Sequence, residues 1–199
     1  MHPAIELLSL VLILGRFVRS KMNYVRINKS SVTEGPGIRL TLFVSGCRNC
    51  CPGCHNPETW CFAAGEPYTS EVEAKILEHI QKPHIAGLTL CGGEPFEPEN
   101  QPALAELCVK VKKYTGKSIW CYTGYELNDL LPDGCKRGIY TQTMLNNIDV
   151  LITGRYIERL RDITDNNRWR GSRNQRVLDL QESLFEGKPV MKAGIPNNN

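Results

Sequence analysis

The sequence predicts an α/β fold built around an open, mainly parallel β-sheet. Four short segments rich in apolar and β-branched residues have the pattern of buried strands, namely residues 39–45, 85–91, 118–122 and 149–153. Helical patterns separate these segments, and strands that alternate with helices form right-handed βαβ units in a parallel sheet. The chain has 199 residues, of which 41% are hydrophobic, which suffices for one domain with its own core.

Helices are expected over residues 69–81, 102–114, 125–131 and 141–147. The first is the clearest, because Thr69 or Ser70 supplies an N-cap. Val72, Ile76 and Ile80 then fall on one apolar stripe, as a helix that packs against a sheet requires.

Each predicted strand ends in a short loop that contains glycine and polar residues. These loops are residues 45–47, 91–94, 123–124 and 153–154. Because the carboxyl ends of parallel strands meet at one edge of a sheet, we expect the four loops to lie together and to form the active site.

Charge and cysteine content exclude several functions. The chain has 24 Lys and Arg against 21 Asp and Glu, and a net charge of +3 is too small to indicate nucleic-acid binding. An odd number of cysteines, nine, prevents complete pairing in disulfides within the chain. Four of them fall within residues 47–54, which indicates metal or redox chemistry.

Residues 1–21 form an N-terminal extension that we expect to be dispensable, with the domain covering residues 22–199. The apolar run at 7–14 is shorter than the roughly 20 residues that cross a bilayer, so no membrane span is expected. No Lys or Arg precedes this run and Glu6 lies at its start, unlike a signal peptide. We expect a cytoplasmic protein, and an amphipathic anchor at the membrane surface is the alternative function of this segment.

Two metal centres fit the segment CRNCCPGC that begins at Cys47. Four thiolates in two adjacent C-x2-C pairs could bind zinc, although structural zinc sites usually separate the pairs by a dozen residues or more. Alternatively, Cys47, Cys51 and Cys54 hold an iron–sulfur cluster at C-x3-C-x2-C spacing. Ordinary cubane clusters and electron carriers take four cysteines, so three would leave one iron open to a substrate.

This spacing, followed by Gly-Gly-Glu-Pro at the end of the next predicted strand, resembles the radical S-adenosylmethionine superfamily. More narrowly, the chain is similar to the activating proteins of anaerobic ribonucleoside-triphosphate reductases. The similar stretches are GPGIR at 35–39, TLFVSGC at 41–47, PGCHN at 52–56, LCGGEP at 90–95, IWCYTGY at 119–125, DVLITGR at 149–155 and WRGSRNQ at 169–175. The similarity extends over about residues 24–180. The Thr-Gly-Tyr at 123–125 and the WRGSRNQ at 169–175 are the stretches that narrow the superfamily to this family.

The resemblance implies a partial βα barrel of the radical S-adenosylmethionine type with a [4Fe-4S] cluster on Cys47, Cys51 and Cys54. It also implies binding of S-adenosylmethionine by two short segments. These cofactor-binding residues are Gly53, Cys54, His55, Gly92, Gly93 and Glu94, with Glu94 near the methionyl amino group. No catalytic residue beyond the cluster and cofactor is expected.

The implied reaction is reductive cleavage of S-adenosylmethionine to methionine and a 5′-deoxyadenosyl radical, which takes a hydrogen atom from a glycine of the partner. The implied partner is an anaerobic ribonucleoside-triphosphate reductase, and a flavodoxin or ferredoxin would supply the electron. Activation of another glycyl-radical enzyme, such as pyruvate formate-lyase, is the alternative.

Two residues depart from the superfamily pattern. Cys50 is an additional thiol, which offers an alternative ligand set with Cys47 and Cys54, and we expect it to be a bystander. Gly53 stands where many superfamily members have an aromatic residue, so adenine contact would come from the backbone or from His55. Residues 169–175 are the expected partner-docking segment, and residues 189–199 are expected to form a loose tail.

Overall fold

The computed structural model describes residues 22–161 and 168–195. The predicted extension at residues 1–21 therefore lies outside the described residues. Within the described ranges, no helix combines the length and the apolar content needed to cross a membrane.

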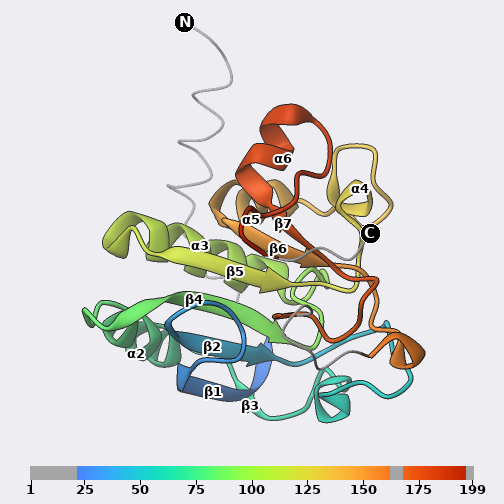
Figure 1. The fold of residues 1–199 in the computed structure, drawn as a ribbon. Coiled ribbons are helices and arrows are strands. Elements are labelled where there is room, and N and C mark those ends of the chain that lie inside the picture. The colour runs from blue at the N-terminus through green and yellow to red at the C-terminus, as the bar shows by residue number, and fades with distance from the viewer. Residues whose placement is uncertain (1–21, 162–167, 196–199) are drawn as a thin grey trace, which may run out of the picture.

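The sheet has seven strands in the order β3-β1-β2-β4-β5-β6-β7 (Figure 1). Its centre consists of four parallel strands, all of which the sequence predicted. They are β2 (Ile38–Val44), β4 (Ile85–Gly92), β5 (Ser118–Tyr122) and β6 (Val150–Thr153). Their arrowheads point to the same side of Figure 1, so their carboxyl ends share one edge.

The predicted helices connect these strands. They are α2 (Ser70–Ile80), α3 (Gln101–Thr115), the single-turn α4 (Leu127–Leu130) and α5 (Thr141–Asn147). The Thr69 hydroxyl accepts a hydrogen bond from the Val72 N–H at 3.4 Å, which confirms the expected N-cap of α2. Helix α3 is capped by Gly116, whose φ of 63° is the left-handed conformation that glycine adopts at low cost.

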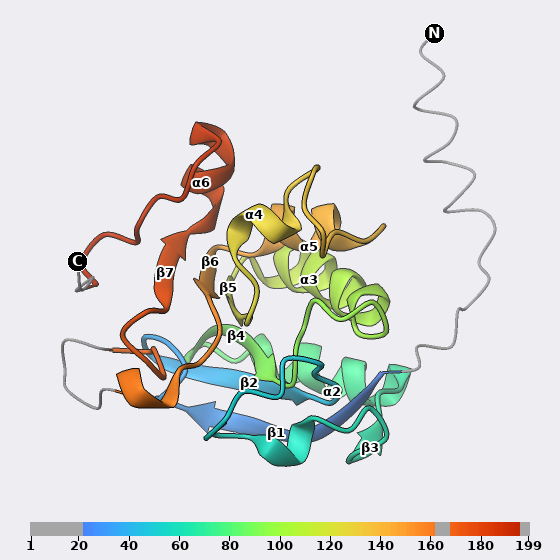
Figure 2. The same cartoon turned by 90° about the vertical axis from the view of Figure 1, so that its right-hand side faces the viewer.

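Antiparallel strands flank the parallel centre, and none of them was expected from the sequence. On one side β1 (Asn23–Ser31) pairs with β2, and β3 (Glu66–Pro67) pairs with β1. On the other side β7 (Arg176–Asp179) pairs with β6 and leads into α6 (Leu180–Glu186). The predicted α/β fold with an open, mostly parallel sheet is therefore confirmed. The antiparallel strands at both edges of the sheet are an addition to that prediction. Figure 2 shows how far the sheet twists between β1 and β7.

The expectation of a loose tail from residue 189 is wrong for its first residues. The Val190 carbonyl accepts from the Asp179 N–H, and the Lys192 N–H donates to the Val177 carbonyl, both at 2.9 Å. These bonds, with a bridge between Leu178 and Met191, extend the sheet beyond β7. Backbone hydrogen bonds that a sequence pattern does not reveal therefore hold this segment.

The main core lies between one face of the sheet and the helices α2, α3 and α5. Leu40 and Leu42 of β2 and Leu88 and Leu90 of β4 are completely buried there, because alternate residues of a strand point to the same face. Burial of each such side chain contributes roughly 1.5–3 kcal/mol. Trp120, Val150, Ile152 and Val177 form a smaller cluster.

Arg39 is buried within the sheet, at 1% exposure. Its Nε donates to the Thr89 hydroxyl at 2.8 Å, and its terminal nitrogens donate to the Leu88 carbonyl and to both oxygens of Ser118. Burial lowers the pKa of Arg39 to about 10. These bonds join β2, β4 and β5 and compensate the cost of burying the guanidinium.

Candidate functional site

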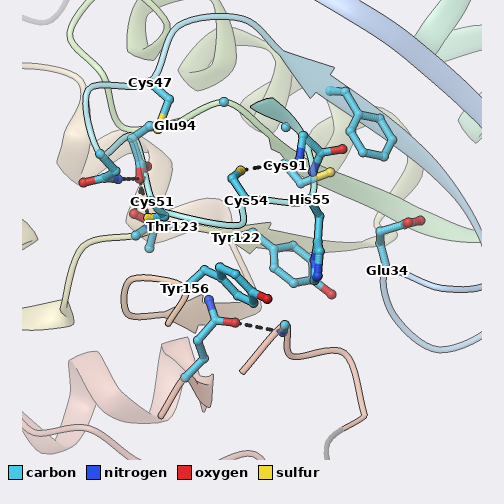
Figure 3. Close-up of a pocket in the computed structure, with 18 of the residues that line it drawn as sticks. Glu34, Cys47, Cys51, Cys54, His55, Cys91, Glu94, Tyr122, Thr123 and Tyr156 are labelled. Carbon is cyan, nitrogen blue, oxygen red and sulfur yellow. Dashed lines mark hydrogen bonds between the residues drawn. The ribbon is translucent and has the colours of Figure 1, made fainter. Parts of the chain in front are cut away.

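A cavity of about 530 Å³ opens at the carboxyl edge of the parallel strands (Figure 3). The loops that follow β2, β4, β5 and β6 all contribute residues to its wall, as the sequence predicted. The lining includes Cys47, Asn49, Cys51, Cys54, His55, Gly92, Gly93, Glu94, Thr123, Gly124, Gly154 and Tyr156. Every residue implied for the cluster or the cofactor thus borders this one cavity, except Gly53.

The loop after β2 is folded so that three thiols border this cavity. The Gly46 and Cys47 N–H groups donate to the carbonyls of Thr59 and Trp60 at 2.8 and 3.1 Å. Cys51 is buried, whereas Cys47 and Cys54 are half-buried. The Asn56 N–H also donates to the Cys54 sulfur at 3.4 Å, a contact of the kind that tunes iron–sulfur clusters.

Cys50 lies outside the lining of the cavity. Its thiol is exposed and donates weakly to the Cys47 carbonyl at 3.7 Å. With a φ of 45°, Cys50 is one of two described residues other than glycine in the left-handed region. The Cys50 thiol is thus exposed and outside the lining that Cys47, Cys51 and Cys54 share.

Burial raises the pKa of the Cys47 thiol to about 12. Without a metal the thiol is therefore protonated at neutral pH. Among the described residues, no three His, Cys, Asp or Glu side chains form a group that could hold a single metal ion. In a [4Fe-4S] cluster each thiolate binds a different iron, so its ligands need not converge on one point.

The buried Glu94 carboxylate connects three loops of the site, namely the cysteine loop and the loops after β4 and β5. One carboxylate oxygen accepts from the Phe96 N–H at 3.0 Å and from the Thr123 hydroxyl at 2.8 Å. The other accepts from the Gly124 N–H at 2.8 Å and from the Asn49 amide at 3.1 Å. Burial raises the pKa of Glu94 to about 7, although its hydrogen bonds act in the opposite direction.

Gly92 and Gly93 allow the loop after β4 to lie against the backbone of the cysteine loop. Gly92 has a φ of 97°, and a Cβ there would lie 2.8 Å from the Phe43 Cα. A Cβ on Gly93 would lie 2.5 Å from the Gly46 carbonyl oxygen. Glycine is therefore required at both positions by the close packing of the two loops, in addition to any contact with a ligand.

A strap formed by residues 155–158 crosses the cysteine loop, and no pattern in the sequence indicated it. The Arg155 guanidinium donates to the Asn49 carbonyl. Tyr156 and His55 have ring centroids 4.8 Å apart, and both rings border the cavity. Glu158 lies over Gly53, where a Cβ would be 2.5 Å from the Glu158 carboxyl carbon.

The segment 169–175, predicted as a partner-docking loop, lies beside the strap, where the Asn174 side chain donates to the Arg155 carbonyl at 2.8 Å. Trp169, Arg170, Gly171 and Gln175 border the cavity. The Gln175 side chain accepts from the Gly171 N–H and donates to the Gly154 carbonyl, both at 2.8 Å. These bonds hold the segment against the end of β6.

Sequence comparisons identify the family. Residues 33–178 match the family described as a 4Fe-4S single cluster domain, and this range includes Cys47, Cys51 and Cys54 of the cysteine loop. The chain is 37% identical over 163 residues to the anaerobic ribonucleoside-triphosphate reductase-activating protein of Salmonella typhi. That alignment covers 80% of this chain and 100% of the relative.

The chain belongs to the family of anaerobic ribonucleoside-triphosphate reductase-activating proteins. Two further relatives carry the same name. The protein of phage T4 is 38% identical over 83% of this chain and 99% of its own length. That of Pasteurella multocida is 41% identical over 77% of this chain and 95% of its own length. These matches confirm the resemblance seen in the sequence, and the 4Fe-4S domain favours an iron–sulfur centre over zinc.

Proposed function

We propose that this protein activates an anaerobic ribonucleoside-triphosphate reductase by generating a glycyl radical on it. One observation carries the proposal: three thiols at C-x3-C-x2-C spacing border the same cavity as the Gly92-Gly93-Glu94 loop. The fourth thiol of the segment, Cys50, is not part of that lining. Three ligands leave one iron of a cubane cluster without a side chain, which is the condition for binding a small molecule to it.

The residues present fit a [4Fe-4S] cluster on Cys47, Cys51 and Cys54. Thiolates are the ligands that such clusters take, and the Asn56 N–H already donates to one of the sulfurs. When bound, the cluster would supply one electron to the sulfonium of S-adenosylmethionine, which yields methionine and a 5′-deoxyadenosyl radical. The protein binds and orients the reactants and excludes water from them.

For S-adenosylmethionine, Gly92 and Gly93 would admit the methionyl group close to the backbone, near Glu94. His55 borders the cavity beside Tyr156 and would face the adenosyl group. Gly53 has no side chain and would contribute through its backbone.

The relatives' shared name favours a ribonucleotide reductase as the partner over pyruvate formate-lyase. A low-potential donor such as flavodoxin or ferredoxin would supply the electron. We further propose that residues 22–199 constitute the functional domain in the cytoplasm, and that the twisted open sheet is the partial barrel of the radical S-adenosylmethionine enzymes.

Anaerobic reconstitution with iron and sulfide tests this proposal. We expect about four irons per chain, and 5′-deoxyadenosine on incubation with S-adenosylmethionine and dithionite. Cys51→Ala should lose both, whereas the matched variant Cys50→Ala should keep both. A wild-type protein that forms a cluster without yielding 5′-deoxyadenosine, or a Cys50→Ala variant that loses its iron, would refute the proposal.

A further inference from the structure

Arg48, the residue directly after Cys47, is hydrogen-bonded to the buried carboxylate of Glu97, which belongs to a different loop. The Arg48 N–H donates to the Glu97 carboxylate at 2.8 Å, and the Arg48 guanidinium pairs with the other oxygen at 2.5 Å. Glu97 is only 2% exposed. A carboxylate this deeply buried is costly without partners, so this contact determines where the backbone next to Cys47 can lie.

Glu97 is itself held in place. Its N–H donates to the Glu94 carbonyl at 3.1 Å, and its carbonyl accepts from Asn100 and Gln101 at 2.9 and 3.1 Å, where α3 begins. Its carboxylate also accepts from the Tyr125 hydroxyl at 3.4 Å. The contact with Arg48 therefore connects the cysteine loop to the start of a fifteen-residue helix.

The other partner of Arg48 differs in one decisive respect. Glu99 pairs with the same guanidinium at 2.6 Å, but its side chain is 35% exposed, and no bond to the Arg48 backbone accompanies the pair. Arg48 thus pairs with one buried and one partly exposed carboxylate. Solvent screens a buried charge much less than an exposed one, so the two carboxylates should act differently on a nearby redox centre.

We propose that Glu97 is a positioning residue that fixes Cys47 through the Arg48 backbone and holds the reduction potential of the cluster low through its charge. This inference rests on the proposed function, because it assumes a cluster on Cys47. The reduced cluster would carry one more electron than the oxidised one, so the buried carboxylate charge beside the cysteine loop disfavours reduction. A low potential is what transfer of an electron to a sulfonium requires.

The matched variants Glu97→Gln and Glu99→Gln test the effect of charge. In Glu97→Gln the new side-chain amide keeps an oxygen that can accept from the Arg48 N–H, so the charge is lost while the backbone contact remains. We expect the one-electron midpoint potential of the reconstituted cluster to rise, with the reduction equilibrium favoured by about threefold to tenfold, where tenfold corresponds to about 59 mV. Glu99→Gln should stay within about twofold of wild type.

Glu97→Asp tests the positioning. It keeps the charge but shortens the side chain, so the contact with the Arg48 N–H is lost. In the full-length chain before cluster loading, we expect alkylation of Cys47 by iodoacetamide to accelerate at least about threefold as the loop loosens. The exposed thiol of Cys135, which lies outside the cysteine loop, is the internal reference that should not change. This measurement needs no cluster, so it stands even if Glu97→Gln fails to assemble one.

The outcomes separate the two proposals. A wild-type chain that forms no cluster would refute the proposed function. A wild-type chain with a cluster whose potential Glu97→Gln leaves unchanged, or changes no more than Glu99→Gln does, would overturn the effect of charge. An unchanged alkylation rate of Cys47 in Glu97→Asp would overturn the positioning.

Discussion

The side-chain amide of Asn49 donates to the Glu94 carboxylate at 3.1 Å, which joins the cysteine loop to the loop after β4. The two residues are 45 positions apart in the chain. On the other side of Asn49, its carbonyl accepts from Arg155 of the strap. Asn49 of the cysteine loop therefore contacts both the loop after β4 and the strap.

Asn49→Ala should destabilise the protein because it removes a hydrogen bond to a buried acceptor. We expect the free energy of unfolding to fall by about 1–2 kcal/mol in urea denaturation. Asn146→Ala is the matched control, because Asn146 is exposed on α5 and accepts only from the nearby Gln142. Equal losses in the two variants would show that the contact with Glu94 is not a brace.

The stability of the chain without a cluster should depend on pH through Glu94. Its pKa is raised from an ordinary 4.5 to about 7, so the folded state binds the proton more tightly than the unfolded state does. This contribution to stability is fully present below pH 4.5 and is lost as the pH rises through about 7. Its upper limit is about 3 kcal/mol.

Glu94→Gln isolates this effect, because the amide does not titrate. The difference in unfolding free energy between wild type and variant should shrink as the pH rises from about 5 to about 8. Urea denaturation at several pH values measures it. A difference that stays constant over this range would contradict the raised pKa.

Gly53 should tolerate a side chain poorly, chiefly because of its backbone conformation. Gly53→Ala must adopt a φ of 69°, so we expect a loss of about 1–2 kcal/mol in stability, with a smaller contribution from displacing the exposed Glu158 carboxyl. The double variant Gly53→Ala/Glu158→Ala should recover the part due to the clash but not the backbone strain. If removing Glu158 recovers nothing, the close approach of these residues is wrong.

Cys50→Gly should be neutral for iron binding and favourable for folding. The left-handed conformation at φ 45° costs a residue with a Cβ roughly 1–2 kcal/mol, and glycine avoids this cost in the folded state. Part of the gain is offset by the larger entropy of glycine in the unfolded chain. Urea denaturation and iron analysis test this together, and loss of iron would identify Cys50 as a ligand.

The parallel centre of the sheet could be predicted because its strands are nearly continuous apolar runs. In β1 (NYVRINKSS) most side chains are exposed or only half-buried, so the segment has no apolar run to detect. Strand β7 has only four residues and lies beside the predicted docking segment. Both strands are defined by pairing with a neighbour, which short-range patterns do not encode.

The cysteines and the Gly-Gly-Glu loop could also be predicted, since their spacing carries the chemistry. Glu97, Asn49 and Tyr156 could not, because ordinary polar and aromatic residues acquire their roles only when loops distant in sequence meet. For Glu94 the sequence predicts only a place near the methionyl amino group, and not its role in connecting loops. Its four hydrogen bonds come from three different loops, and no local pattern reveals them.

The most direct measurement is electron paramagnetic resonance of the reduced, cluster-loaded protein mixed with S-adenosylmethionine and an anaerobic ribonucleoside-triphosphate reductase. We predict a glycine-centred radical on the reductase, which disappears when Cys51→Ala replaces the wild-type activator. Formation of 5′-deoxyadenosine without any such radical would contradict the assigned partner. A radical that forms equally well with Cys51→Ala would contradict the three-cysteine cluster.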